Sequence, residues 1–157
     1  MEPLSVAEGM RRAPRTDYLP AEVRMLADED RPLPIGDGAT NSQPSTVRAM
    51  LELLDVRPGQ RVLDVGSGSG WTTAILGHLV GPDGEVIGVE LIERLAVEAG
   101  ERLAAAGLSH TSARVAVPGV LGAPGDGPFD RILVSAEADA LPEGLADNLA
   151  SVLPREI

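Results

Sequence analysis

Residues 61–80 of the sequence read RVLDVGSGSGWTTAILGHLV. The first five form a short apolar run typical of a buried strand, and the last ten are apolar enough for a helix that ends at Gly81-Pro82. Between them, three glycines alternate with serines: Gly66, Gly68 and Gly70. Glycine permits a sharp turn and lets a ligand approach the backbone closely. This stretch therefore predicts a strand, a ligand-binding turn and a helix.

The alternation of strands and helices continues on the C-terminal side. We expect strands at 85–90, 113–117 and 129–135, and helices at 92–106 and 142–153. Strands that alternate with helices form parallel sheets, so the predicted fold class is α/β: a Rossmann-like, doubly wound, mainly parallel sheet. Such sheets bind ligands at the carboxyl ends of the strands, where the strand order reverses.

The N-terminal side has a different pattern. A short helix that ends near Pro14 and a brief helical turn within 20–30 are expected there. Residues 31–44 are rich in glycine and proline, which predicts a loop. Because that loop is longer than a simple connector, a function for it is plausible. The apolar spacing after Pro44 then indicates a helix.

Composition argues against several classes of protein. A formal net charge of −11 and only three aromatic residues disfavour a nucleic-acid-binding surface. Arg11, Arg12 and Arg15 are the one small basic group, which we expect on a solvated helix surface. With no cysteine and two scattered histidines, His78 and His110, no metal site is expected. The sequence shows neither a membrane span nor a signal peptide, so we expect a cytoplasmic location.

The glycine turn differs from two common phosphate-binding loops. Residues 64–70 have the pattern D-x-G-x-G-x-G. A dinucleotide-binding loop needs G-x-G-x-x-G, and Trp71 occupies the position of its third glycine, which disfavours a NAD-dependent oxidoreductase. A P-loop needs a following Gly-Lys-Ser/Thr, which is absent. For Trp71 itself, packing in the core is the preferred interpretation over a ligand contact.

Two carboxylates accompany the turn. Glu90 ends the second predicted strand, and a carboxylate can accept hydrogen bonds from both hydroxyls of a ribose. Asp64 directly precedes the turn. S-adenosylmethionine carries a cationic amine and a sulfonium, so a site with carboxylates and no basic residue suits it better than a pyrophosphate. Two plainer interpretations stay open: Glu90 as a solvated strand end, and Asp64 as a cap on the next helix.

Several segments resemble known methyltransferases. Residues 62–80 resemble the first motif of class I methyltransferases, which gives the superfamily but not the substrate. Residues 34–44 (PIGDGATNSQP) resemble the loop of protein-L-isoaspartate O-methyltransferases, and 128–136 (PFDRILVSA) resemble the fourth strand of that family. Residues 141–143 (LPE) match the start of its next helix. The resemblance extends from about residue 5 to residue 150.

The resemblance implies repair of damaged proteins: methylation of the α-carboxylate of L-isoaspartyl residues with S-adenosylmethionine as methyl donor. It places Thr40 and Ser42 at the reaction centre. The cofactor contacts that it implies are Asp64, Gly66, Ser67, Gly68, Gly70, Glu90 and Leu91. The length of 157 residues fits a single domain over 1–157, in which the resemblance implies a helix and substrate loop in 1–44 and a cofactor-binding core in 45–157. Apart from the resemblance, Ser42 also fits a helix N-cap and Thr40 a plain loop position.

Three features depart from the family pattern. Val117-Pro118-Gly119 stands where the family has an acidic residue near the adenine. Ala39 and Asn41 replace the commoner glutamine and isoleucine, so Asn41 adds polar groups where the family has an apolar side chain. The chain stops at Ile157, before the family's last strands. We therefore expect the fourth strand to be a sheet edge, with low stability, self-association or reliance on a partner.

These departures keep two alternatives open. The altered loop around Asn41 would suit a methyltransferase for a small molecule. The missing acid and the short C-terminus would suit a non-catalytic remnant that binds S-adenosylmethionine or a partner protein. The leading interpretation is the isoaspartyl methyltransferase, with damaged proteins or peptides as partners.

Overall fold

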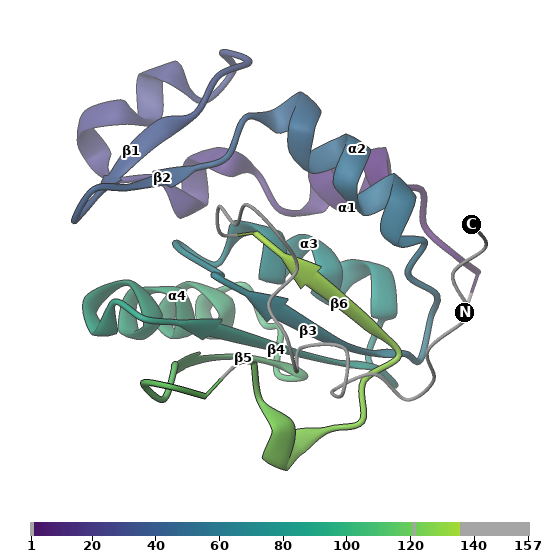
Figure 1. Ribbon diagram of the computed structural model, residues 1–157. Coiled ribbons are helices and arrows are strands. Elements are labelled where there is room, and N and C mark those ends of the chain that lie inside the picture. The colour runs from purple at the N-terminus through teal and green to yellow at the C-terminus, as the bar shows by residue number, and fades with distance from the viewer. Residues whose placement is uncertain (1, 121, 136–157) are drawn as a thin grey trace, which may run out of the picture.

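The computed structural model describes residues 2–120 and 122–135 (Figure 1). Helices and a small hairpin lie over one face of a four-stranded sheet in this part of the chain. The α-helices are α1 (Val6–Arg12), α2 (Pro44–Leu54), α3 (Trp71–Val80) and α4 (Glu93–Ala105). The strands are β1 (Leu33–Gly36), β2 (Ala39–Asn41), β3 (Arg61–Val65), β4 (Glu85–Glu90), β5 (Thr111–Val115) and β6 (Arg131–Val134). Short 3-10 helices are η1 (Arg15–Tyr18), η2 (Ala21–Leu26) and η3 (Pro124–Asp126).

The four-stranded sheet has the order β5-β4-β3-β6, and each neighbouring pair is parallel. The predicted α/β class with a mainly parallel sheet is therefore confirmed. From β3 the chain proceeds outward through β4 and β5, and it then returns to the other side of β3 as β6. The strand order thus reverses at β3, and a ligand site is expected at the carboxyl ends of β3, β4 and β6.

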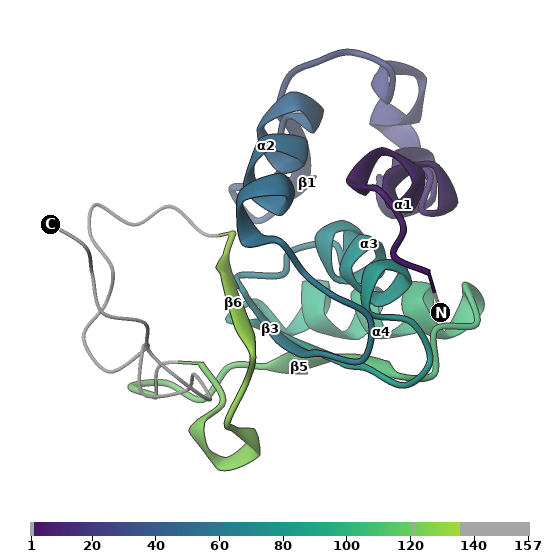
Figure 2. The same cartoon turned by 90° about the vertical axis from the view of Figure 1, so that its right-hand side faces the viewer.

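Apolar side chains alternate between the two faces of the sheet. Val62 belongs to a core cluster around α3, which is enclosed by the sheet below and by α1 and α2 above (Figure 2). Its neighbour Leu63 belongs to a second cluster on the opposite face, together with Phe129 from the segment before β6. This alternation follows from the two-residue period of a strand. It holds β3 rigidly between two cores and so gives the following turn a fixed base.

The prediction of a loop over 31–44 is wrong in part, because β1 and β2 form an antiparallel hairpin within it. Its turn is Asp37-Gly38, and both residues have positive φ, 55° and 75°. Asp-Gly is a preferred pair for such hairpin turns because both residues tolerate that conformation. The sequence therefore held a local signal for the hairpin, which the abundance of glycine and proline masked.

Four further expectations need correction or lie outside the described residues. The third strand spans Thr111–Val115 rather than 113–117, and the fourth spans Arg131–Val134 rather than 129–135. Ser42 is not the N-cap of α2, since Gln43 takes that position without a side-chain hydrogen bond. The predicted helix at 142–153 and the last residues lie outside the described part of the chain.

Residues 2–120 and 122–135 contain no helix long and apolar enough to span a membrane. They also contain no cluster of three or more side chains that could hold a metal ion. In the same part of the chain β6 is an end strand of the sheet. His110 has a hydrogen-bond partner in the carbonyl oxygen of Gly77, at 2.7 Å.

Candidate functional site

The glycine turn between β3 and α3 needs its glycines for two different reasons. Gly66, Gly68 and Gly70 have φ values of 79°, 55° and 91°, a region that residues with a Cβ rarely adopt. Gly70 also lies against α4, where an added Cβ would be only 2.9 Å from the Cβ of Ala99. The turn is tied to β4, since the backbone amides of Gly66 and Ser67 both donate to the carbonyl of Val89, at 2.8 and 3.1 Å.

Glu90 at the end of β4 supports the same turn. Its Oε1 accepts a hydrogen bond from the amide of Gly68 at 3.0 Å, and its Oε2 accepts one from the amide of Ile92 at 2.9 Å. The residue is only 9% exposed, so it is not a solvated strand end. A carboxylate offers about four acceptor positions. Glu90 therefore orders the turn and retains capacity for ligand hydroxyls.

Asp64 lies beneath the turn rather than in a cavity. Its fully buried carboxylate accepts hydrogen bonds from the hydroxyls of Thr72 at 2.6 Å, Thr73 at 2.9 Å and Ser135 at 2.7 Å. Burial raises the pKa of Asp64, the three hydroxyl donors work in the opposite direction, and the charge of Glu90 adds to the rise. Asp64 thus joins the first turn of α3 to the end of β6, and among its contacts Thr72 and Ser135 reach the cavity walls.

Two adjoining cavities open where the strand order reverses. The larger has a volume of about 1080 Å³, enough for a nucleoside-sized ligand, and the smaller about 30 Å³, enough for one or two waters. The larger is lined by apolar Val89, Leu91 and Val120 as well as by Glu90. Among the described residues, five line both cavities: Thr40, Ser42, Gly66, Gly68 and Ser135.

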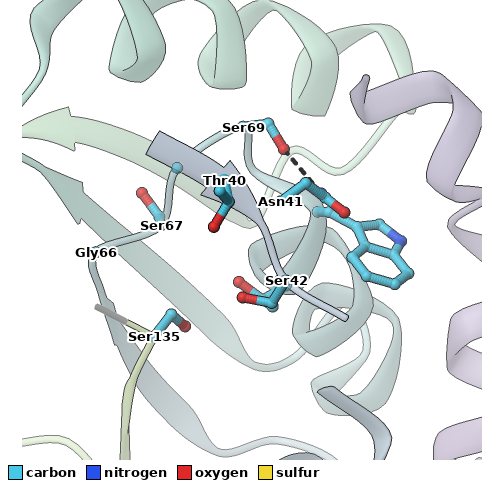
Figure 3. A pocket seen from close by; sticks show the side chains of 10 residues that line it. Thr40, Asn41, Ser42, Gly66, Ser67, Ser69 and Ser135 are labelled. Atoms are coloured by element: carbon cyan, nitrogen blue, oxygen red, sulfur yellow. Dashed lines mark hydrogen bonds between the residues drawn. The ribbon is translucent and has the colours of Figure 1, made fainter. Parts of the chain in front are cut away.

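Hydroxyl groups gather around the smaller cavity, between β2 and the glycine turn (Figure 3). Thr40 and Ser42 come from the hairpin side, Ser67 from the turn, and Ser135 from the end of β6. The Oγ of Ser67 is the one buried side-chain polar atom without a partner in the described residues. The sequence did not single out Ser135, although its place at the carboxyl end of a strand beside β3 could have indicated it.

Arg15 was expected on a solvated surface, and this is wrong. It is only 7% exposed, and its Nε donates to the Oδ1 of Asn41 at 2.7 Å. Its guanidinium also donates to five backbone carbonyls, those of Ala27, Glu29, Arg31, Asn41 and Ser42, at 2.7–3.4 Å. Burial lowers the pKa of Arg15, but a guanidinium stays charged in a protein. The segment that contains Asn41 and Ser42 is therefore held by a buried cation.

Trp71 packs in the core, as expected. The side chain is buried among residues of the α3 core cluster, and its Nε1 donates to the carbonyl of Ala13 at 2.8 Å. Its ring also lies 5.5 Å from the guanidinium carbon of Arg15, within the range of a cation–π contact. Trp71 thus packs against Arg15 and also lines the smaller cavity.

The segment that departs from the family pattern lies beside the larger cavity. Ala116 and Val120 line it, and Val117 is exposed. This wall therefore offers apolar side chains to a ligand, in keeping with the absence of an acid at Val117-Pro118-Gly119. Leu91, one of the predicted contact residues, is largely exposed and lines the same cavity.

Comparisons with known proteins agree on one family. The family model described as protein-L-isoaspartate(D-aspartate) O-methyltransferase matches residues 2–152. A protein-L-isoaspartate O-methyltransferase of Ignicoccus hospitalis is 44% identical over 92% of this chain and 68% of its own length. That of Methanopyrus kandleri is 46% identical over 92% of this chain and 64% of its own length.

Two solved structures described as members of the same family also superpose on most of the chain. One described as a protein-L-isoaspartate O-methyltransferase superposes with a TM-score of 0.82 and 29% identity, covering 92% of this chain and 47% of its own. Another, from Plasmodium falciparum and in complex with S-adenosyl-L-homocysteine, has a TM-score of 0.77 and 28% identity over 96% of this chain and 73% of its own. The chain spans roughly two thirds of the curated relatives above. It belongs to the protein-L-isoaspartate(D-aspartate) O-methyltransferase family.

Proposed function

We propose that this chain transfers a methyl group from S-adenosylmethionine to the α-carboxylate of L-isoaspartyl residues in damaged proteins. The observation that carries the proposal is the shared wall of the two cavities. The acceptor pair Thr40 and Ser42 faces the glycine turn there, and both line both cavities. A donor bound along the turn and a carboxylate bound at the hydroxyls would therefore be neighbours.

The larger cavity suits the methyl donor. Its described lining contains one carboxylate, Glu90, and no lysine or arginine, which favours a cationic ligand. The free acceptor capacity of Glu90 suits the hydroxyls of a ribose. Apolar side chains of Leu91 and Val120 suit a flat base. The complex of the Plasmodium falciparum relative with S-adenosyl-L-homocysteine supports this assignment.

The acceptor side needs placement more than proton transfer. A carboxylate is already ionised near pH 7, so no strong general base is required. The hydroxyls of Thr40 and Ser42 can orient it by donating hydrogen bonds. S-adenosylmethionine, when bound, would supply a methyl group on a sulfonium: an aligned carboxylate oxygen would bond to the methyl carbon as the methyl–sulfur bond breaks, with S-adenosylhomocysteine as the leaving group. The residues of the site therefore contribute by holding the acceptor in line and by limiting water around it.

Labelled S-adenosylmethionine and a matched pair of peptides test the proposal. We expect label on a peptide with an L-isoaspartyl residue and none on its normal aspartyl twin. Ser42→Ala should lower kcat about tenfold, because the acceptor loses one orienting hydrogen bond. Ser109→Ala is the control, since that serine is exposed between α4 and β5. Equal label on both peptides, or an unchanged kcat for Ser42→Ala, would contradict the assignment.

The alternatives give different results in the same assay. A non-catalytic remnant would bind S-adenosylhomocysteine but transfer no label. A small-molecule methyltransferase would bind S-adenosylhomocysteine and leave both peptides unlabelled while methylating a small carboxylate.

We further propose a cytoplasmic location and self-association through the edge of β6. Sedimentation as a stable monomer would contradict the self-association.

A further inference from the structure

Asn41 lies between Thr40 and Ser42, and its side chain links the two halves of the site. The side chain is 4% exposed. Its Oδ1 accepts the hydrogen bond from Arg15, and its Nδ2 donates to the Oγ of Ser69 in the glycine turn at 3.3 Å (Figure 3). One amide therefore bridges the acceptor strand β2 to the turn that would hold the methyl donor.

Arg15 fixes the backbone on either side of the acceptor pair. Besides Asn41 Oδ1, it donates to the backbone carbonyls of Asn41 at 3.4 Å and Ser42 at 3.2 Å. Its remaining contacts anchor it to the segment before β1, through the carbonyls of Ala27, Glu29 and Arg31. The planar guanidinium cannot shift towards one group without losing another. The acceptor strand is thus held at several points by one rigid cation.

We propose that Arg15 and Asn41 are positioning residues, which set Thr40 and Ser42 against the glycine turn through the chain Arg15–Asn41–Ser69. The inference rests on the proposed function. A methyl transfer needs the acceptor oxygen close to the methyl carbon and in line with the breaking bond, and an error of about 1 Å can cost a hundredfold in rate. A link between the acceptor strand and the donor turn supplies that alignment.

The contacts of Asn41 in the structure differ from the role that the sequence indicated for it. From the sequence alone, the altered loop around Asn41 would suit a methyltransferase for a small molecule. The Oδ1 and Nδ2 of Asn41 both contact protein groups instead. An isoleucine, the commoner residue, would remove the acceptor of Arg15 Nε and the donor to Ser69. A buried polar group without a hydrogen-bond partner destabilises the folded state. The conformation of residues 39–42 therefore depends on the side-chain amide of Asn41.

Two variants of Asn41 separate positioning from simple stability. Asn41→Leu keeps the number and branching of the side-chain heavy atoms but removes both polar atoms, whereas Asn41→Asp keeps the acceptor for Arg15 and can accept from the Ser69 hydroxyl. We expect Asn41→Leu to lower kcat for the isoaspartyl peptide about tenfold or more, with a smaller change in KM for S-adenosylmethionine. Asn41→Asp should recover most of kcat. Val80→Ala, which opens a core gap at the far end of α3, should lower the unfolding temperature and leave kcat unchanged.

Hydrogen exchange gives a readout that does not depend on catalysis. S-adenosylhomocysteine should slow exchange in residues 39–43 of the wild type and of Val80→Ala. In Asn41→Leu that slowing should disappear from 39–43 and remain at 66–70. All variants are compared at a temperature where each is folded.

The results distinguish failure of the positioning role from failure of the proposed function. If Asn41→Leu retains kcat, or if S-adenosylhomocysteine does not slow exchange at 39–43 in the wild type, the positioning role is overturned. If the wild type fails to methylate the isoaspartyl peptide but Asn41→Leu still uncouples 39–43 from the bound ligand, the proposed function fails and the link between the two loops stands. Failure of Asn41→Asp to recover kcat would also overturn the role of the Arg15 contact.

Discussion

The glycine turn at 66–70 and the proposed acceptor segment at 39–42 line the same cavities but are held in different ways. The turn owes its shape to its own glycines and to neighbouring β4, through Val89 and Glu90. The acceptor segment is held by Arg15, about 26 residues earlier in the chain. The proposed donor half of the site is therefore encoded mainly in a local motif, and the proposed acceptor half in a long-range buried polar network.

The comparison implies that the two halves can be damaged separately. A change in the turn should weaken binding of the donor first, because the turn contributes backbone groups to the larger cavity. A change in the polar network should impair alignment of the acceptor while leaving the donor side in place. Four variants test this separation.

Arg15→Ala should have the largest effect. It removes a donor from five carbonyls and from Asn41, so we expect a loss of about 3 kcal/mol in the free energy of unfolding and methyl transfer too slow to detect. The affinity for S-adenosylhomocysteine should fall much less. Urea unfolding measures the stability, the label assay measures methyl transfer, and calorimetric titration measures the affinity. Arg48→Ala, in an exposed ion pair, is the control. An equal loss of donor affinity and acceptor turnover would refute the separation.

Gly70→Ala should damage the donor half. A Cβ at φ 91° is strained and would meet Ala99 at 2.9 Å, so we expect a loss of about 2 kcal/mol in stability and a clear loss of S-adenosylhomocysteine affinity. Gly107→Ala is a matched control, because Gly107 also has a positive φ, 75°, but no atom lies near its added Cβ. If calorimetric titration gave similar affinities for the wild type and Gly70→Ala, displacement of the glycine turn would have no effect on binding of S-adenosylhomocysteine.

Glu90→Gln should weaken donor binding without unfolding the protein. The amide nitrogen of glutamine cannot accept a hydrogen bond, so either Gly68 or Ile92 loses its partner. We expect about a tenfold lower affinity for S-adenosylhomocysteine, which corresponds to one buried charge-assisted hydrogen bond. Glu93→Gln, at an exposed position nearby, should keep the wild-type affinity. An affinity unchanged in Glu90→Gln would exclude a role of its charge in the site.

Asp64→Asn should have the smallest effect, a change in the free energy of unfolding that depends on pH. The pKa of Asp64 is raised in the folded state, so the unfolded chain releases this proton at a lower pH than the folded chain does. Stability is therefore lost as the pH rises above about 4, up to the raised pKa, and is constant beyond it. Relative to the wild type, Asp64→Asn should gain stability over that interval. Urea unfolding from pH 4 to pH 8 measures it, and a difference that falls with rising pH would contradict the direction of the shift.

Local patterns in the sequence predicted much of the cofactor-binding core. The bounds of β3, α3 and β4 match the prediction because each has a continuous apolar run and a turn residue at its end. The third strand was shifted by two residues, since Thr111 and Ser112 pair with β4 although neither is apolar. Glu90 was identified as a site residue, but its hydrogen bonds to the turn depend on how β4 lies beside β3 and could not be seen in the sequence.

The acceptor half was harder to predict. Thr40 and Ser42 were identified only through the resemblance to a family. The burial of Arg15 was missed because its partners are carbonyl oxygens, which every residue carries and no sequence pattern marks. Ser135 was missed although its place at the end of a predicted strand was a signal, and its contact with Asp64, which joins two strands far apart in the chain, could not be seen in the sequence. Contacts of this kind follow from tertiary structure alone.

The most direct test of the account is a crystal structure of this chain with S-adenosylhomocysteine and an isoaspartyl peptide. We predict that the nucleoside occupies the larger cavity with its ribose hydroxyls on Glu90, and that the peptide carboxylate contacts Ser42 and Thr40. The Arg15–Asn41–Ser69 hydrogen bonds should be intact. A peptide bound elsewhere, or a carboxylate that faces a positive side chain instead of these hydroxyls, would contradict the account.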